Sequence, residues 1–426
     1  MTPVGSVGDL EGVVNQAAQL CRVPAAAVAV IDKTGTHVVA SASADPEMTG
    51  EIGSVTKVMT ATLVLQHVAR GEISLDDPVA KYVDDFQLEP PEATQLVTIG
   101  DLLCHASGCD FDEFSDVGDG DDCLSRYVRD ALAGEAWDRP GTRWNYSNGG
   151  YSLLGRLIEV IDGRTFDDAL VARIADPLGL SVTTHFRVDP NRAVETGHLP
   201  DPSTGEIVED RRRFPRSAGP AGGALATATD LAHFGHTLVS GGAELLPTEW
   251  ASRMRTSQMP ARFGSQGLGW LIDHEGNPYY HGGTVSQSAN LLAIPGRATI
   301  GVVGNAAGGA VGIAMFVANH LFGPSAPAPT NIPEGEPALS PEACAGTYES
   351  KCVTQHLTVD GDGLNVRQEH TGHLADLLPA PSPFHVQSLG GGCYGNNFGL
   401  RWDFSDPDAR GRATRLLTLR SHKRID

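Results

Sequence analysis

The stretch Glu51-Ile-Gly-Ser54-Val-Thr-Lys57-Val-Met-Thr60 is the segment from which the fold is interpreted. From Ser54 to Arg70 the apolar residues recur with helical spacing, and a glycine follows directly. Residues at i and i+3 share a helix face, so Ser54 and Lys57 can touch. A buried lysine loses its proton more readily, and a helix N-terminus favours negative charge on a serine oxygen. The pair predicts a serine nucleophile with a lysine base, although a helix cap beside a surface lysine has the same spacing.

A second polar motif is Trp144-Asn-Tyr146-Ser-Asn148-Gly-Gly-Tyr151. Tyr146 and Asn148 are two positions apart, so in extended backbone their side chains lie on the same side. A tyrosine hydroxyl near a cation can serve as a general base, and an asparagine amide can orient a substrate carbonyl. The same spacing recurs at Tyr394-Gly-Asn396, so the motif is weak by itself.

The third motif, His281-Gly-Gly283-Thr284, lies at the edge of a predicted strand pair. Glycines there allow a substrate backbone to approach closely, and a backbone N–H can complete an oxyanion hole. Two similar stretches compete with it. Lys33-Thr34-Gly35 precedes the serine in a predicted hairpin turn, and His370-Thr-Gly372 follows a proline-rich segment. The order along the chain favours His281.

In the order S-x-x-K, Y-S-N, H-G-G, the motifs resemble those of the serine β-lactamase and penicillin-binding-protein superfamily. They are most similar to its class C β-lactamase-like branch, which includes D-stereospecific peptidases, esterases and acyltransferases. The supporting stretches are Leu102-Leu-Cys-His105-Ala-Ser-Gly108, Tyr151-Ser-Leu-Leu-Gly155, Ser217-Ala-Gly-Pro-Ala-Gly222 and Gly267-Leu-Gly-Trp270. The resemblance covers about residues 10–322 and implies an antiparallel sheet flanked by helices, with an all-α subdomain and the site between them.

The resemblance also implies roles for individual residues. Ser54 would be the nucleophile that forms an acyl-enzyme. Lys57 and Tyr146 would share the general-base role, and their separate parts stay open. Asn148 would hold either the substrate amide or the Lys57 ammonium.

The third motif receives its role in the same way. The backbone N–H groups of Ser54 and Thr284 would form the oxyanion hole, beside Gly282 and Gly283. His281 stands where β-lactamases of this branch usually carry a lysine that helps bind the β-lactam carboxylate. This departure argues against efficient β-lactam turnover and suits the peptidases, esterases and acyltransferases. We expect the charge of His281 to depend on pH, because an imidazole titrates near neutrality.

The composition divides the chain into two parts. Residues 1–322 mix helical and strand patterns and predict an α/β domain. Six prolines between Phe322 and Pro341 predict a semi-rigid linker over 323–341. Short alternating segments over 342–426 predict a small antiparallel β-barrel domain, which resembles the lipocalin-like barrels attached to some family members. The predicted helices are 11–23, 54–70, 99–105, 151–161, 165–174, 227–239 and 311–321, and the predicted strands are 25–32, 37–42, 268–273, 288–294 and 299–304.

Charge and cysteine content exclude several classes of function. The 31 basic and 52 acidic side chains give a net charge of −21, which argues against a nucleic-acid or membrane partner. Seven cysteines without a C-x-x-C motif predict packed thiols. The first twenty residues lack the pattern of a signal peptide, which predicts a cytoplasmic protein. We expect no cofactor and no metal, and we interpret His233 and His236 as a helix face and acidic residues 110–122 as a solvated loop.

The predicted function is serine acyl transfer on a small-molecule or peptide substrate. The first interpretation is hydrolysis of a peptide-like amide or ester through acyl-Ser54, with a preference for a D-residue. The alternative is aminolysis, as in penicillin-binding-protein-type thioesterases, peptide cyclases or small-molecule acyltransferases, with a carrier-bound thioester as one donor. A non-catalytic binding protein on the same scaffold is the third interpretation. It predicts decay of the motifs, all of which are present.

Overall fold

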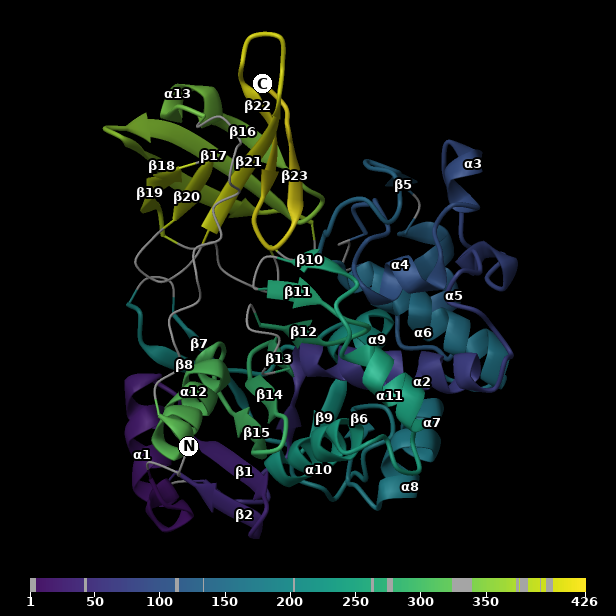
Figure 1. The fold of residues 1–426 in the computed structure, drawn as a ribbon, viewed down its shortest axis with the longest axis vertical. Helices are drawn as coiled ribbons and strands as arrows, with labels where there is room; N and C mark the ends of the chain where they lie inside the picture. Colours follow the sequence, from purple (N-terminus) through teal and green to yellow (C-terminus); the bar gives the residue numbers. More distant parts are fainter. Residues whose placement is uncertain are drawn as a thin grey trace.

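The computed structural model contains an α/β part followed by a closed β-barrel (Figure 1). This is the architecture that the sequence predicted. Within the part of the chain described, no helix has the length and apolar character needed to cross a membrane. The described residues are 5–41, 44–111, 115–132, 134–201, 204–261, 264–273, 279–323, 339–372, 375, 382–390, 392–395 and 401–426.

The central sheet has eight strands, and each neighbouring pair is antiparallel. Along β1, the strand next to one edge of the sheet, Ala27 and Ala29 face one apolar cluster while Val28 and Val30 face another. The sheet therefore lies between two cores, as the two-residue alternation of a strand requires. In spatial order the strands are β10 (Met259–Ala261), β11 (Gly264–Gln266), β12 (Leu271–Ile272), β13 (Tyr279–Thr284), β14 (Ser288–Ile294), β15 (Ala298–Gly304), β1 (Ala26–Asp32) and β2 (Gly35–Ala40).

Helices cover both faces of this sheet (Figure 1). The first and last helices of the α/β part, α1 (Leu10–Leu20) and α12 (Gly309–Phe322), pack together on one face. On the other face, α10 (Ala228–Val239) packs against β1 and β15. Helix α2 (Thr56–Ala69) runs between the sheet and the remaining helices, and all its residues from Thr56 to Val68 are buried.

The remaining short elements complete the helical layer and its edges. The helices are α3 (Pro91–Thr94), α4 (Ile99–Leu103), α5 (Cys123–Asp130), α6 (Asn148–Asp162), α7 (Phe166–Leu170), α8 (Asp176–Leu178), α9 (Gly219–Gly222) and α11 (Thr248–Met254). Single turns are η1 (Val7–Asp9), η2 (Gly53–Val55), η3 (Val79–Lys81), η4 (Val171–Ala175) and η5 (Arg216–Ala218). Three small sheets pair β3 (Gly50–Glu51) and β6 (Thr183–Thr184) with β9 (Ala224–Ala226), β4 (Leu88–Glu89) with β5 (Gly134–Glu135), and β7 (Gly197–Pro200) with β8 (Ile207–Asp210).

Most predicted boundaries agree with the structure to within a few residues, and Thr227 begins α10 with a capping box. The Thr227 hydroxyl accepts a hydrogen bond from Asp230 N at 3.0 Å, and the Asp230 carboxylate accepts one from Thr227 N at 2.9 Å. Two predictions are wrong in part. The predicted helix 165–174 changes to a π-helical turn at η4. The predicted strand 268–273 begins only at β12, because Gly269 bends the chain at φ +84° to pass Ala61 of α2.

Smaller predictions also meet the structure. None of the seven cysteines forms a disulfide, and all but one are buried. His233 and His236 lie exposed on α10. In the acidic segment, the Asp121 carboxylate lies 2.9 Å from Arg216 of η5, so solvent is not the sole partner of this loop.

The C-terminal barrel closes through eight antiparallel strands. Buried aromatic rings fill its interior, with Tyr348 edge-on to Phe404 at 5.6 Å between ring centroids. A short helix, α13 (Pro341–Cys344), precedes it. The predicted linker lies mostly outside the described residues. The strands are β16 (Gly346–Glu349), β17 (Val353–Asp360), β18 (Gly363–His370), β19 (Phe384–Gly390), β20 (Cys393–Gly395), β21 (Arg401–Pro407), β22 (Ala413–Leu417) and β23 (Ser421–Arg424).

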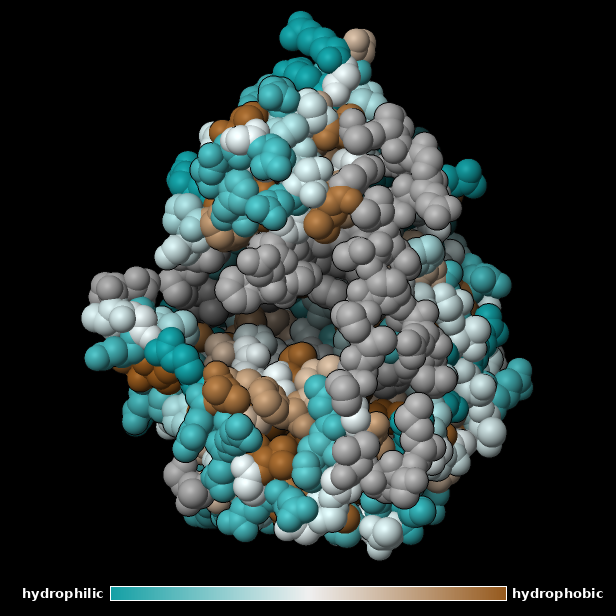
Figure 2. All heavy atoms as spheres, turned by 60° about the vertical axis from the view of Figure 1, so that its left-hand side comes forward, coloured by the Kyte–Doolittle hydropathy of each residue, from teal (hydrophilic) through white to brown (hydrophobic). Residues whose placement is uncertain are grey.

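The barrel is hydrogen-bonded directly to the α/β part. Lys351 N donates to the Asp110 carboxylate at 2.6 Å, and Ser421 N donates to the Asn145 side-chain oxygen at 2.9 Å. The ammonium of Lys423 lies 4.5 Å from the ring centroid of Trp137. The surface is hollowed between the barrel and the α/β part (Figure 2). Because Asn145 directly precedes Tyr146, one of these contacts reaches the second motif.

Candidate active site

Ser54 lies in the single turn η2, immediately before α2 and facing β13. Thr56 holds this turn in place. Its hydroxyl donates to the Gly53 carbonyl at 2.7 Å and accepts a hydrogen bond from Ala224 N of β9 at 3.2 Å. Gly53 has φ +51°, which favours a residue without a side chain. The hydrogen bonds of Thr56 therefore fix the backbone of the turn that carries Ser54.

Lys57 is fully buried one helical turn after Ser54. Its Nζ lies 3.0 Å from Ser54 Oγ, 2.6 Å from the Asn148 side-chain oxygen and 2.7 Å from the Ala221 carbonyl. The last two oxygens can only accept, so they take both hydrogens of a neutral amine. Its lone pair then faces the Ser54 hydroxyl, which is the geometry a general base requires.

The electrostatic surroundings favour this neutral amine. Burial, assisted by the positive charge of Arg420, lowers the pKa of Lys57 well below its usual range. The ammonium form would lie in a site that also holds a second cation. Lys57 is therefore suited to accept a proton at neutral pH.

Tyr146 and Asn148 reach the same point from the start of α6. The Ser147 hydroxyl caps this helix by accepting a hydrogen bond from Gly150 N at 3.0 Å, which fixes the two flanking side chains. The Tyr146 hydroxyl is hydrogen-bonded to Ser54, and its ring centroid lies 4.8 Å from Lys57 Nζ. Burial raises the pKa of Tyr146, so at neutral pH it is a phenol that can donate a proton.

The backbone of β13 lies directly against the nucleophile turn. A Cβ placed on Gly283 would lie 1.9 Å from the Ile52 carbonyl oxygen and 2.8 Å from Ser54 N. A Cβ on Gly53 would lie 2.7 Å from Thr284 N. Such close approach is possible only because positions 53 and 283 carry no Cβ, and it brings the N–H groups of Ser54 and Thr284 together. This is the juxtaposition that an oxyanion hole needs.

His281 is also buried at this site, but its expected pH-dependent charge is not supported. Its Nδ1–H donates to the Gly282 carbonyl at 2.8 Å, and its ring centroid lies 6.4 Å from that of Tyr146. Burial and the nearby charge of Lys57 lower the pKa of His281 to about 3. The imidazole is therefore neutral at pH 7. The sequence alone could not show that His281 is buried, and this burial is the main cause of its lowered pKa.

The structure separates the three motifs from their sequence look-alikes. The Lys33-Thr34 pair forms the exposed turn between β1 and β2, with the Thr34 hydroxyl bonded to Asp32. His370 ends β18, and Tyr394 lies buried in the barrel on β20. The candidate residues that meet at one point are Ser54, Lys57, Tyr146, Asn148, His281, Gly282, Gly283 and Thr284.

Arg420 is a site residue that sequence reasoning missed. It lies in the turn between β22 and β23, next to Ser421, which is bonded to Asn145. Its charge lowers the pKa of Lys57 and of His105 in the α/β part. Burial lowers the pKa of Arg420 itself to about 10, so it is cationic at neutral pH. No local sequence signal marks it, because only the docking of the barrel brings it near Lys57.

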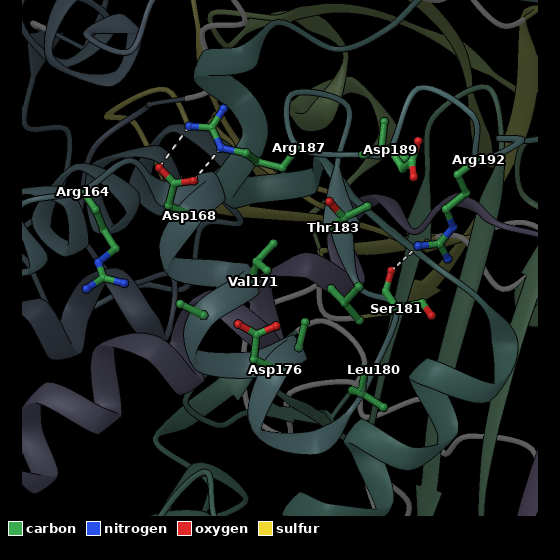
Figure 3. Close-up of a pocket in the computed structure, with 14 residues that line it drawn as sticks. Arg164, Asp168, Val171, Asp176, Leu180, Ser181, Thr183, Arg187, Asp189 and Arg192 are labelled. Carbon is green, nitrogen blue, oxygen red and sulfur yellow. Dashed lines mark hydrogen bonds and ion pairs between the residues drawn. The ribbon is translucent and has the colours of Figure 1, made fainter.

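A separate pocket lies beside η4 and the segment that follows β6 (Figure 3). Two of its arginines are paired, one with a carboxylate and one with a backbone carbonyl. Arg187 binds the Asp168 carboxylate, and Arg192 donates to the Ser181 carbonyl. None of the candidate active-site residues lines this pocket.

Comparison with known proteins agrees with the motifs. The Beta-lactamase family model matches residues 10–332, and the chain belongs to this family. It is 35% identical over 363 residues to Penicillin-binding protein 4 of Amycolatopsis lactamdurans, covering 77% of this chain and 93% of that protein. The superfamily prediction is therefore confirmed. The chain is an enzyme of the hydrolase and acyltransferase class of this family.

Solved structures show how far the fold extends. SurE has a TM-score of 0.74 at 23% identity, covering 98% of this chain and 99% of SurE. A D-stereospecific amidohydrolase from Streptomyces sp. has a TM-score of 0.63 at 24% identity, covering 74% of this chain and 99% of the other. The likeness to SurE thus includes the barrel, and both comparisons concern the fold alone.

Proposed function

We propose that the protein is a serine acyl-transfer enzyme that forms an acyl-Ser54 intermediate and hydrolyses a peptide-like amide or ester, with a preference for a D-residue. The observation that carries this proposal is the fully buried Lys57 side chain, whose Nζ lies 3.0 Å from Ser54 Oγ and whose pKa is lowered by that burial. Similar folds described as a D-stereospecific amidohydrolase and as SurE with D-Leu support the choice of a D-residue.

In the first half-reaction, Lys57 takes the Ser54 proton while Oγ attacks the substrate carbonyl carbon. The resulting oxyanion is held by the N–H groups of Ser54 and Thr284. When the bond to the leaving group breaks, the Tyr146 phenol protonates that group and regains its proton from the Lys57 ammonium. The Ser54 proton thus ends on the leaving group, and both side chains return to their starting states.

The second half-reaction resolves the acyl-enzyme. A water molecule gives one proton to the neutral Lys57 amine as its oxygen attacks the ester carbonyl. When the ester C–O bond breaks, the Lys57 ammonium returns a proton to Ser54 Oγ and the acid is released. Aminolysis, with an amine in place of water, is the second candidate. Arg420 suits both outcomes, because this cation can bind the carboxylate of an amino-acid acceptor or that of a leaving group.

The test uses a short peptide ester and a peptide thioester, each ending in a D-residue, with the L-epimers as controls. Intact-protein mass and product mass are recorded together for the wild type and for Ser54→Ala. We expect an acyl adduct with the D-substrates that the variant lacks. A free-acid product means hydrolysis, and a cyclic or amine-captured product means aminolysis. An adduct that persists in Ser54→Ala, or no adduct and no turnover with any substrate, contradicts the proposal.

Arg420 provides a prediction on substrate charge and pH. For substrates with a free carboxylate, Arg420→Met should raise KM roughly 10- to 100-fold, since it removes a charge-assisted hydrogen bond. Removing this cation also raises the pKa of Lys57, so the acid limb of the kcat/KM profile should move to higher pH. The measurement is steady-state kinetics on the carboxylate substrate and its methyl ester, with exposed Arg410→Met as the matched control. Equal effects on both substrates would contradict this role.

A further inference from the structure

His105 is a buried residue that packs against the motif at residues 144–151. The mechanism above gives it no role. His105 follows α4 with a backbone φ of +59°, a region that residues other than glycine seldom occupy. Its side chain is 2% exposed. A strained and fully enclosed polar residue beside a reacting group is a reason to look for a function.

His105 is hydrogen-bonded to the two residues that flank Tyr146 in the sequence. Asn145 N donates to the His105 carbonyl at 2.8 Å, and Ser147 N donates to His105 Nδ1 at 3.1 Å. These are the residues immediately before and after Tyr146. The positive φ turns both the carbonyl and the side chain of His105 toward the same segment. One residue therefore satisfies two alternate N–H groups, as a neighbouring strand would.

The imidazole ring also packs on the tyrosine. Its centroid lies 4.4 Å from that of Tyr146 and 5.0 Å from that of Tyr151, with interplanar angles of 32° and 39°. Because Nδ1 accepts the Ser147 hydrogen bond, the ring proton of the neutral imidazole lies on Nε2. Nε2 is buried and has no hydrogen-bond partner among the described residues. The imidazole therefore directs its hydrogen bond toward the tyrosine segment.

We propose that His105 is the positioning residue for Tyr146: it fixes the backbone on both sides of the tyrosine and holds the phenol ring in line with Ser54. This inference rests on the proposed function and names a further residue of that same site. A shift of the ring would separate its hydroxyl from the leaving group, and transition-state proton transfer is sensitive to such displacements.

The test is a double-mutant cycle with variants that tolerate positive φ. His105→Gly removes ring and acceptor without backbone strain, and His105→Asn keeps an acceptor near the position of Nδ1. We expect His105→Gly to lower the acylation rate constant roughly 100-fold with little change in substrate Kd, and His105→Asn to recover about 10-fold of that loss. In a Tyr146→Phe background the same glycine substitution should change the rate less than 3-fold, because its effect acts through the tyrosine hydroxyl.

The matched control is His67, another buried histidine, which lies at the far end of α2 and contacts Glu72 and Asp162. His67→Asn should lower thermal stability and give the same rate change with and without Tyr146. If the effects of His105→Gly and Tyr146→Phe are additive, the positioning role is overturned while an adduct on wild-type Ser54 still supports the proposed function. If the wild type forms no adduct, the proposed function itself fails. If His105→Gly does not fold, the same cycle is run with His105→Asn, where additivity again overturns the role.

Discussion

Lys57→Met is expected to reduce kcat/KM for an ester substrate roughly 1,000-fold or more, because it removes the group that accepts the Ser54 proton. Methionine has a similar length and no charge, so it fits the buried position of Lys57 with little change in volume. The amine is hydrogen-bonded to Asn148 and to the Ala221 carbonyl, and both acceptors lose their donor in the variant. A single-turnover assay on purified protein, with acylation followed by mass, measures the effect.

The pH profile of the wild type belongs to the same prediction. Burial lowers the pKa of Lys57 well below its usual range, so the active neutral amine persists to lower pH than that of an exposed lysine and is lost as pH falls through the lowered pKa. We therefore expect kcat/KM to fall on the acid side and not to require alkaline pH. Lys81→Met, at an exposed lysine paired with Asp77, is the control and should leave the rate unchanged. A Lys57→Met variant that acylates at the wild-type rate would exclude Lys57 as the base.

Gly283→Ala is expected to reduce kcat roughly 100- to 1,000-fold, the range seen when an oxyanion donor is lost. The added Cβ would lie 1.9 Å from the Ile52 carbonyl, so β13 and the nucleophile turn must separate. Separation moves Thr284 N away from Ser54 N, and the two can no longer bind one oxygen. Steady-state kinetics with a chromogenic ester, together with a thermal melt, measures both the rate and any loss of stability.

The neighbouring glycine is a matched control on the same strand. A Cβ on Gly282 meets Val311 Cγ2 at 3.1 Å, which is the end of a side chain on α12 that can move. Gly282→Ala should therefore keep most of the activity. If the two alanine variants behave alike, the close approach of β13 to Ser54 N has no catalytic importance.

Much of the site could be predicted because its parts are carried by local patterns. The i, i+3 relation of Ser54 and Lys57 follows from helix geometry alone, and the structure preserves it in α2. The strand 288–294 follows from the pattern of its own residues, so its bounds were predicted at the residue level. The charge state of His281 could not be predicted, because its pKa depends on burial and on Lys57, which lies far away in sequence.

The sequence by itself determined the family, the order of the motifs, the two-part organisation and the candidate residues that those motifs carry. Only the tertiary structure decided which of them meet and in what protonation state. Docking of the barrel brings Arg420 close enough to lower the pKa of Lys57. Folding also brings His105 into hydrogen bonds with the residues immediately before and after Tyr146. The physical reason is the range of the forces. Helix spacing and capping act over a few residues, whereas desolvation and Coulomb interactions depend on everything packed within several ångströms.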